Sequence, residues 1–147
     1  MPSLLIGDVA ERTGLNPPTI RYYERIGLLM PPARSATGYR RYTERMVEEL
    51  HFVRKAQSLG FSLEEIGEIL KLSRSGAAPC AHVLDLARQH LAAVEERIAQ
   101  LAKFREQLAG EIQKWDGARQ PTCEGLCEII SGAATIAPIE LHPPRRR

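Results

Sequence analysis

Short amphipathic stretches separated by turn-forming residues fill the first quarter of the chain. Apolar residues recur at helical spacing in "IGDVAERT", and Gly14 follows as a C-cap, so a helix is predicted over 6–13. Asn16 is a suitable N-cap and Pro17 fits a first helical position, which predicts a second helix over about 17–26. Two short helices joined by "TGLN" predict a helix-turn-helix.

The next stretch, "LLMPPARSATGYRRYT", changes the pattern. Its two prolines exclude a helix at the start, and "RSATGYRRY" predicts a small hairpin, or wing. Thr43 is expected to cap a third helix through about Ser58. Ser62 and Glu65 stand at capping-box spacing and predict a short fourth helix. The predicted interior positions of the third helix are Val47, Leu50 and Val53.

A long helix is predicted from Ala81 to Ile112, after the linker "SRSGAAPC". Its apolar residues recur at steps of three and four, which forms a heptad seam with one interruption at Arg105. A helix of this length, at about 1.5 Å per residue, is longer than a small domain is wide, so the seam requires a partner. We therefore expect a homodimer through this helix. The seam residues are Leu84, Ala87, Leu91, Val94, Ile98, Leu101, Leu108 and Ile112.

Composition adds limits on the class of protein. The chain has 147 residues, of which 44% are hydrophobic and 26% charged, as in an ordinary globular protein. No apolar run approaches the ~20 residues that span a bilayer, and the first residues do not resemble a signal peptide, so a cytoplasmic protein without membrane contact is expected.

Charge is distributed unevenly along the chain. Between Thr19 and Arg41 five arginines stand against one acid, Glu24, and three tyrosines are interleaved with them. Such a segment suits a surface that faces phosphates, although a solvated arginine-rich loop has the same composition.

The three cysteines are Cys80, Cys123 and Cys127. In a reducing compartment they are expected to be metal ligands or free thiols rather than disulfides, and an odd number points the same way. Burial as small hydrophobic side chains is the alternative.

The segments "IGDVAERTGLNPPTIRYYERIGLL", "PPARSATGYRRYT" and "VRKAQSLGFSLEEIGEIL" resemble the MerR family of bacterial transcription regulators. The long helix followed by a loop with cysteines is similar to the metal-sensing branch, and the resemblance extends to about Ala133. It implies a mainly α fold: a winged helix-turn-helix over 1–75, a hinge and dimerisation helix forming an antiparallel coiled coil over 76–116, and a metal-binding loop with a short helical turn over 117–135. The remaining residues, 136–147, end in "HPPRRR" and are expected to form a disordered tail.

The resemblance implies a homodimer on double-stranded, pseudo-palindromic promoter DNA, where RNA polymerase also binds. Effector binding would make the dimer distort the promoter spacer and so activate transcription. Three residues on the second helix and three on the wing match the family's DNA-contacting positions. They are Thr19, Arg21, Tyr22, Arg34, Tyr39 and Arg40. By the same resemblance Tyr23 packs inward.

The resemblance also bears on the cysteines. Cys80 stands where the family's sensors of divalent metals have cysteine and its monovalent sensors have serine, which implies a thiophilic divalent ion: Hg, Zn, Cd or Pb. In the family this ligand and the loop cysteines come from different subunits. Cys127 matches the second loop cysteine. Cys123 departs from the pattern, because the usual first loop cysteine falls eight or nine residues before the second, where Arg119 and Ala118 stand. His82 and His90 are candidates for a fourth ligand.

Two other functions compete with metal sensing. One is a thiol- or redox-responsive regulator on the same scaffold, using one reactive cysteine. The other is an enzyme, which the sequence does not support, because it offers no Ser–His–Asp set, no phosphate-binding glycine motif and no prominent carboxylate pair.

Overall fold

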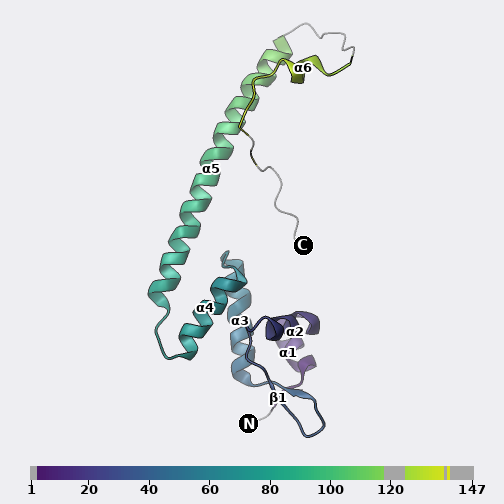
Figure 1. The fold of residues 1–147 in the computed structure, drawn as a ribbon, viewed down its shortest axis with the longest axis vertical. Helices are drawn as coiled ribbons and strands as arrows, with labels where there is room; N and C mark the ends of the chain where they lie inside the picture. Colours follow the sequence, from purple (N-terminus) through teal and green to yellow (C-terminus); the bar gives the residue numbers. More distant parts are fainter. Residues whose placement is uncertain (1–2, 118–124, 138, 140–147) are drawn as a thin grey trace. The chain divides into compact units, whose positions relative to one another are not determined.

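The computed structural model describes residues 3–117, 125–137 and 139. The contacts divide the chain into two compact units, Met1–His90 and Leu91–Arg147, which we call the N-terminal and the C-terminal unit. The elements follow in the order α1 (Ile6–Thr13), α2 (Pro17–Arg25), β1 (Ala33–Arg34), β2 (Arg40–Arg41), α3 (Glu44–Ser58), α4 (Leu63–Arg74), α5 (Cys80–Gly117) and α6 (Glu128–Ser131) (Figure 1).

Capping residues account for the helix boundaries in the N-terminal unit. Asn16 accepts a bond from the Thr19 N–H at 3.0 Å, and Thr43 accepts one from the Met46 N–H at 3.3 Å. Ser62 and Glu65 form the predicted capping box of α4, with bonds of 3.0 and 3.1 Å. The bounds of these helices agree with the sequence predictions.

The turn between α1 and α2 depends on Gly14. Its φ is 69°, a conformation that residues with a Cβ rarely adopt. A Cβ at this position would also lie 2.6 Å from a terminal nitrogen of Arg54, whose guanidinium donates to the Thr13 carbonyl. Gly14 thus allows α3 to hold the end of α1 through Arg54.

The core of the N-terminal unit is formed by α1 to α4 and the segments between them. Val9, Ile20 and Leu50 are fully buried, as is Ile66 of α4. Tyr23 is also buried and its hydroxyl lies 3.3 Å from Gln57 Oε1, so the prediction that it packs inward is confirmed. The start of α5 contributes to the same core through its partly buried residues Val83, Leu86 and Ala87.

The wing is an antiparallel pair, β1 with β2, in which Ala33 pairs with Arg41 and Arg34 with Arg40. Its turn closes through bonds from the Ser35 N–H to the Tyr39 carbonyl at 2.8 Å and from the Gly38 N–H to the Ser35 carbonyl at 2.9 Å. Tyr42, directly after β2, exchanges two backbone bonds of 2.9 Å with Leu4. The wing is therefore anchored to the segment that leads into α1.

In the C-terminal unit, α5 continues beyond its predicted end at Ile112 to Gly117. α6 is a single short turn, and the chain after it returns alongside α5 (Figure 1). Glu111 is buried on α5, and its carboxylate accepts a 3.0 Å bond from Lys114. The predicted tail, 136–147, lies mostly outside the described residues.

Candidate functional site

Three of the residues predicted to contact DNA line one hollow of the N-terminal unit. Arg21 comes from α2, and Tyr39 and Arg40 come from the wing, while residues 5–8 at the start of α1 complete the wall. Residues 5–8 were not among the residues predicted to contact DNA. A basic, concave surface between a helix-turn-helix and a wing suits a phosphate backbone.

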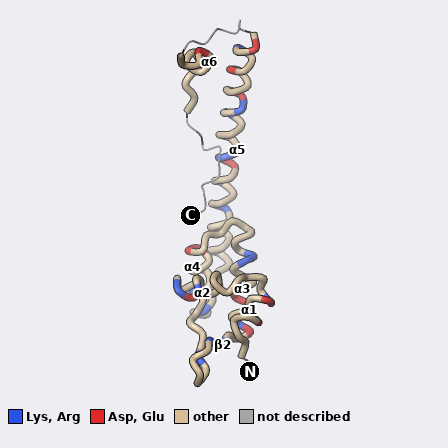
Figure 2. The backbone as a smooth tube through the Cα atoms, turned by 90° about the vertical axis from the view of Figure 1, so that its right-hand side faces the viewer, with Lys and Arg blue, Asp and Glu red and all other residues tan. Residues whose placement is uncertain are grey.

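The acids beside this hollow are held by neighbouring donors. Asp8 accepts a 2.9 Å bond from the Leu5 N–H at the start of α1. Glu24 accepts bonds from Arg40 Nε at 3.1 Å and from the Tyr42 hydroxyl at 2.5 Å. The pKa of Tyr42 is raised, first by burial and then by its bond to Glu24, so the hydroxyl remains a donor. Figure 2 shows the basic residues along α2 and the wing.

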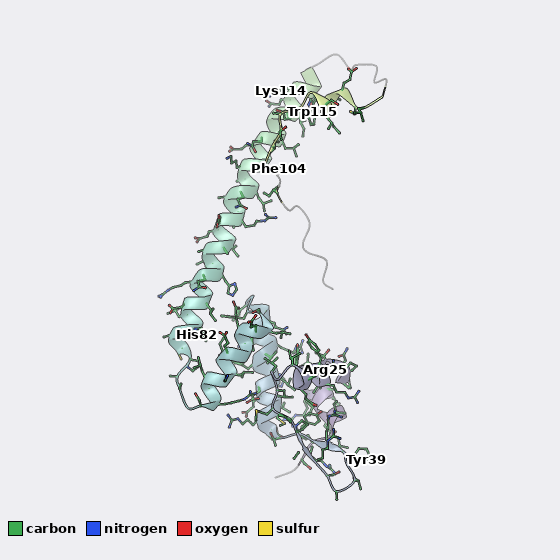
Figure 3. The ribbon with its side chains drawn as sticks, in the orientation of Figure 1. Arg25, Tyr39, His82, Phe104, Lys114 and Trp115 are labelled. Carbon is green, nitrogen blue, oxygen red and sulfur yellow. The ribbon has the colours of Figure 1, made fainter. Side chains whose placement is uncertain are left out.

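On α2, Tyr22 is 43% exposed, and the Arg25 guanidinium lies 5.6 Å from its ring centre, a cation–π geometry. Arg25 was not among the residues predicted to contact DNA, although it is exposed and stacks on Tyr22; Figure 3 labels it on α2. Thr19 is partly buried, and its hydroxyl donates to Asn16 Oδ1 at 2.5 Å. Thr19 therefore supports the N-cap of α2.

The two wing arginines have intramolecular bonds as well. A terminal nitrogen of Arg34 donates to the Gly38 carbonyl at 3.0 Å, across the turn. Arg40 donates to Glu24 through Nε. A guanidinium has five N–H donors, so each retains donors for a phosphate. Tyr39, at 66% exposure, lies at the tip of the wing (Figure 3).

The thiols stand at helix starts. Cys80 is the first residue of α5 and Cys127 is the N-cap of α6, and both are exposed. At such positions unpaired backbone N–H groups favour nearby negative charge. Cys123 lies outside the described residues. Among the residues that are described, no group of three or more His, Cys, Asp and Glu side chains is placed to hold a metal ion.

Both histidines considered as fourth ligands face carboxylates of α4. His90 Nε2 lies 2.9 and 3.1 Å from the two carboxylate oxygens of Glu65, and its ring meets Phe61 edge-on at 5.6 Å. His82 Nε2 lies 3.4 Å from Glu68. These pairs join α4 to the start of α5, a role that was not predicted for the histidines.

A second hollow lies in the C-terminal unit, between α5 and the returning chain. Phe104 and Ile139 supply its apolar wall, and Arg97 and Lys103 supply charge. Figure 3 shows Phe104, Lys114 and Trp115 on α5. In the part of the chain that the structure describes, no helix is long and apolar enough to cross a membrane.

Two family models match the chain between residues 4 and 110. The model of the MerR helix-turn-helix family of regulatory proteins matches residues 4–73, and a second model, for MerR DNA binding, matches residues 47–110. An HTH-type transcriptional regulator of Pseudomonas aeruginosa, itself uncharacterized, is 40% identical over 127 residues, which are 86% of this chain and 96% of the relative.

Two further similarities cover most of both proteins. A heavy metal-dependent transcription regulator of Rhizobium meliloti is 36% identical over 138 residues, 94% of this chain and 93% of the relative. The transcription regulator PbrR691 of Ralstonia metallidurans, solved in complex with lead(II), superposes with a TM-score of 0.72 at 28% identity, covering 88% of this chain and 99% of that one. The match to the family models and the identity across nearly the whole chain lead to one conclusion: this protein belongs to the MerR family of helix-turn-helix transcription regulators.

Proposed function

We propose that this chain is a metal-responsive transcription regulator that binds promoter DNA as a homodimer. One observation carries the proposal: Cys80 is exposed on the first residue of α5, and the following turns of the same helix pack into the core of the DNA-binding unit through Val83, Leu86 and Ala87. A ligand that moves Cys80 therefore acts on a helix that is continuous with that core.

The donor set fits a thiophilic divalent ion. Thiolates are soft ligands that suit Hg, Cd, Pb and Zn, and in this proposal Cys80 of one subunit joins Cys123 and Cys127 of its partner. His82 and His90 are engaged with Glu68 and Glu65, which favours a site of three thiolates. The relative from Rhizobium meliloti is named heavy metal-dependent, and the structural relative binds lead(II), which supports this class of effector.

The promoter is the target in this proposal. Arg21 and Tyr22 of α2 contact the bases and the backbone of double-stranded DNA, and Arg34, Tyr39 and Arg40 hold the backbone through the wing. Metal binding shifts the two DNA-binding units of the dimer and distorts the spacer, which realigns the promoter elements for RNA polymerase. Bending a site of 20–30 base pairs costs about 1–6 kcal/mol, which a shift between the two DNA-binding units has to supply.

Anaerobic titration of the reduced dimer with Pb, Cd, Hg and Zn tests the metal site. Cys80→Ser is expected to abolish tight binding and metal activation while leaving DNA binding intact, because oxygen is a poor ligand for soft ions. Thiolate-to-metal absorption reports the stoichiometry. A redox-responsive regulator would instead respond to oxidant while showing no stoichiometric metal absorption.

A mixed dimer tests the sharing of ligands. One subunit carries Cys80→Ser, and the other carries Cys123→Ser and Cys127→Ser. One tightly bound metal per dimer is expected, since one complete shared site remains. If the mixed dimer binds none, the three cysteines of a single chain form the site.

Arg21→Ala tests the DNA surface. The loss of a base contact is expected to weaken operator binding by about 1–3 kcal/mol while dimerisation and metal binding persist. Unchanged affinity in a gel-shift assay at fixed salt would remove Arg21 from the interface.

A further inference from the structure

Glu24 is the one acid among the five arginines between Thr19 and Arg41. It lies on α2, but its carboxylate faces the wing, where it accepts bonds from Arg40 Nε at 3.1 Å and from the Tyr42 hydroxyl at 2.5 Å. The Glu24 side chain is 10% exposed, and Tyr42 is fully buried. The carboxylate is thus held by one donor from β2 and one from the residue directly after β2.

These two donors are held by different neighbouring segments. Arg40 pairs with Arg34 in the strands of the wing. Tyr42 exchanges backbone bonds with Leu4, next to the start of α1. The carboxylate of Glu24 consequently ties α2 to the wing and, through Tyr42, to the wall of the basic hollow. Because Arg40 uses Nε for this bond, the bond to Glu24 does not occupy its two terminal NH₂ groups.

We propose that Glu24 is a positioning residue for DNA binding. It holds Arg40 and the wing at a fixed distance from Arg21 on α2, so that the helix and the wing meet the DNA backbone as one rigid surface, and it makes no contact with DNA itself. The inference rests on the proposed DNA-binding function and adds to it a residue whose charge is opposite to that expected at a DNA surface.

A positioning role and a simple charge effect predict opposite changes in DNA affinity when Glu24 is replaced. Removing an acid beside a DNA-binding surface reduces repulsion of phosphates, so Glu24→Gln should tighten binding if Glu24 has no positioning role. Positioning predicts weaker binding. The two donors use different oxygens of Glu24, Oε2 for Arg40 and Oε1 for Tyr42, and Gln replaces one of these acceptors with an NH₂ group. The sign of the change therefore separates the two explanations.

The experiment measures affinity by fluorescence anisotropy over a series of salt concentrations. The probe is a duplex that the wild-type dimer selects from a random library. Glu24→Gln is expected to bind about tenfold or more weakly than the wild type, since bonds to charged groups are among the stronger ones. Glu24→Asp keeps the charge and shortens the side chain, so it is expected to bind more weakly too. Glu11→Gln, at an exposed acid of α1, is the matched control and is expected to bind as tightly as the wild type or more so.

The salt dependence distinguishes positioning from simple loss of stability. Arg40→Gln should lower the slope of log affinity against log salt by about 0.9, the value for one phosphate contact. Glu24→Gln should lower it by the same amount, and the double variant should bind no more weakly than the weaker single variant. A destabilised protein whose folded fraction binds normally would keep the wild-type slope, and thermal unfolding of each variant gives that fraction.

Each outcome is decisive. If Glu24→Gln binds as tightly as the wild type or more so, or if Glu24→Asp is unchanged, the positioning role is wrong and the proposed function stands. Should Glu24→Gln fail to fold, Glu24→Asp decides through its affinity and its salt slope, with Arg40→Gln as the reference for the loss of one phosphate contact. If the wild-type protein selects no sequence from the library, the proposed function and this inference both fail.

Discussion

The N-terminal unit and the middle of α5 use the same apolar residue types in opposite environments. Leu50 is fully buried in the N-terminal unit, whereas Leu91 and Ile98 of α5 are 58% and 60% exposed. Burying one such side chain stabilises a protein by about 1.5–3 kcal/mol. The N-terminal unit obtains this free energy within one chain, and the seam of α5 obtains it only when a partner covers it.

The change between the two environments occurs within one helix. Val83, Leu86 and Ala87 pack against the core of the N-terminal unit, while Leu84 on the same turns is exposed. Ala87, predicted as a seam residue, therefore belongs to that core as well. The first turns of α5 serve the DNA-binding unit, and the later turns remain available for dimerisation, which is how a single helix can connect the two functions.

The largest expected effect comes from a charge in the seam. Ile98→Asp should dissociate the proposed dimer, because two-fold symmetry buries the unpaired carboxylate twice, at about 3–5 kcal/mol for each uncompensated charge. Sedimentation velocity at micromolar concentration measures the outcome. Ala93→Asp places the same charge on an exposed position outside the seam and should sediment as the wild type does. A normal dimer for Ile98→Asp would mean that another surface forms the interface.

A smaller effect is expected from two matched truncations. Leu50→Ala should lower the free energy of unfolding of the N-terminal unit by about 2–5 kcal/mol, because it leaves a cavity in a closed core. Leu91→Ala removes the same atoms from an exposed position and should leave that value unchanged, while weakening dimerisation. Hydrogen exchange at α3 reports the first quantity, and the concentration dependence of sedimentation reports the second. If both variants lowered the protection of α3 from hydrogen exchange equally, the division between the two regions would be wrong.

The helices of the N-terminal unit were predictable because their signals are local. Asn16 with Pro17, Thr43, and Ser62 with Glu65 act within one helical turn, and each begins a helix at the expected residue. The exposed seam of α5 followed from periodicity for the same reason. The prediction of the family was possible for the same reason, because its motifs also lie within short segments of the sequence.

Long-range contacts were not predictable. Glu24 meets Arg40 and Tyr42 across 16 and 18 residues, and His90 meets Glu65 across 25. Nothing in the spacing of these residues indicates a pair, because the turn between two elements sets which side chains meet. A single acid within a basic segment was the one available sign for Glu24. The returning chain that lies against α5 carried no periodic signal at all.

The smallest expected effect concerns the boundary between the two regions, where His90 is the last residue of the N-terminal unit. The pKa of Glu65 is lowered, first by the bond from the Ser62 N–H and then by the bond from His90. A carboxyl group whose pKa is lower in the folded state stabilises that state above its unfolded pKa of about 4.3, and this contribution is lost as the pH falls through the folded value. Acidification from about pH 5 to pH 3 should therefore weaken the attachment of α4 to the start of α5.

The wild type and two variants should differ in how steeply their stability changes with pH. The slope of stability against pH in this range should be steepest for the wild type, shallower for His90→Gln, and shallowest for Glu65→Gln, because the bond from Ser62 remains when His90 is replaced. His51→Gln, at an exposed histidine of α3, is the control and should match the wild type. Denaturant unfolding at each pH measures the slope, and hydrogen exchange in α4 shows whether the change occurs at this helix. If the slope for His90→Gln matches that of the wild type, the His90–Glu65 contact does not attach α5 to the N-terminal unit. In that case only the packing of Val83, Leu86 and Ala87 joins the start of α5 to the buried core, and the exposed seam begins after these residues.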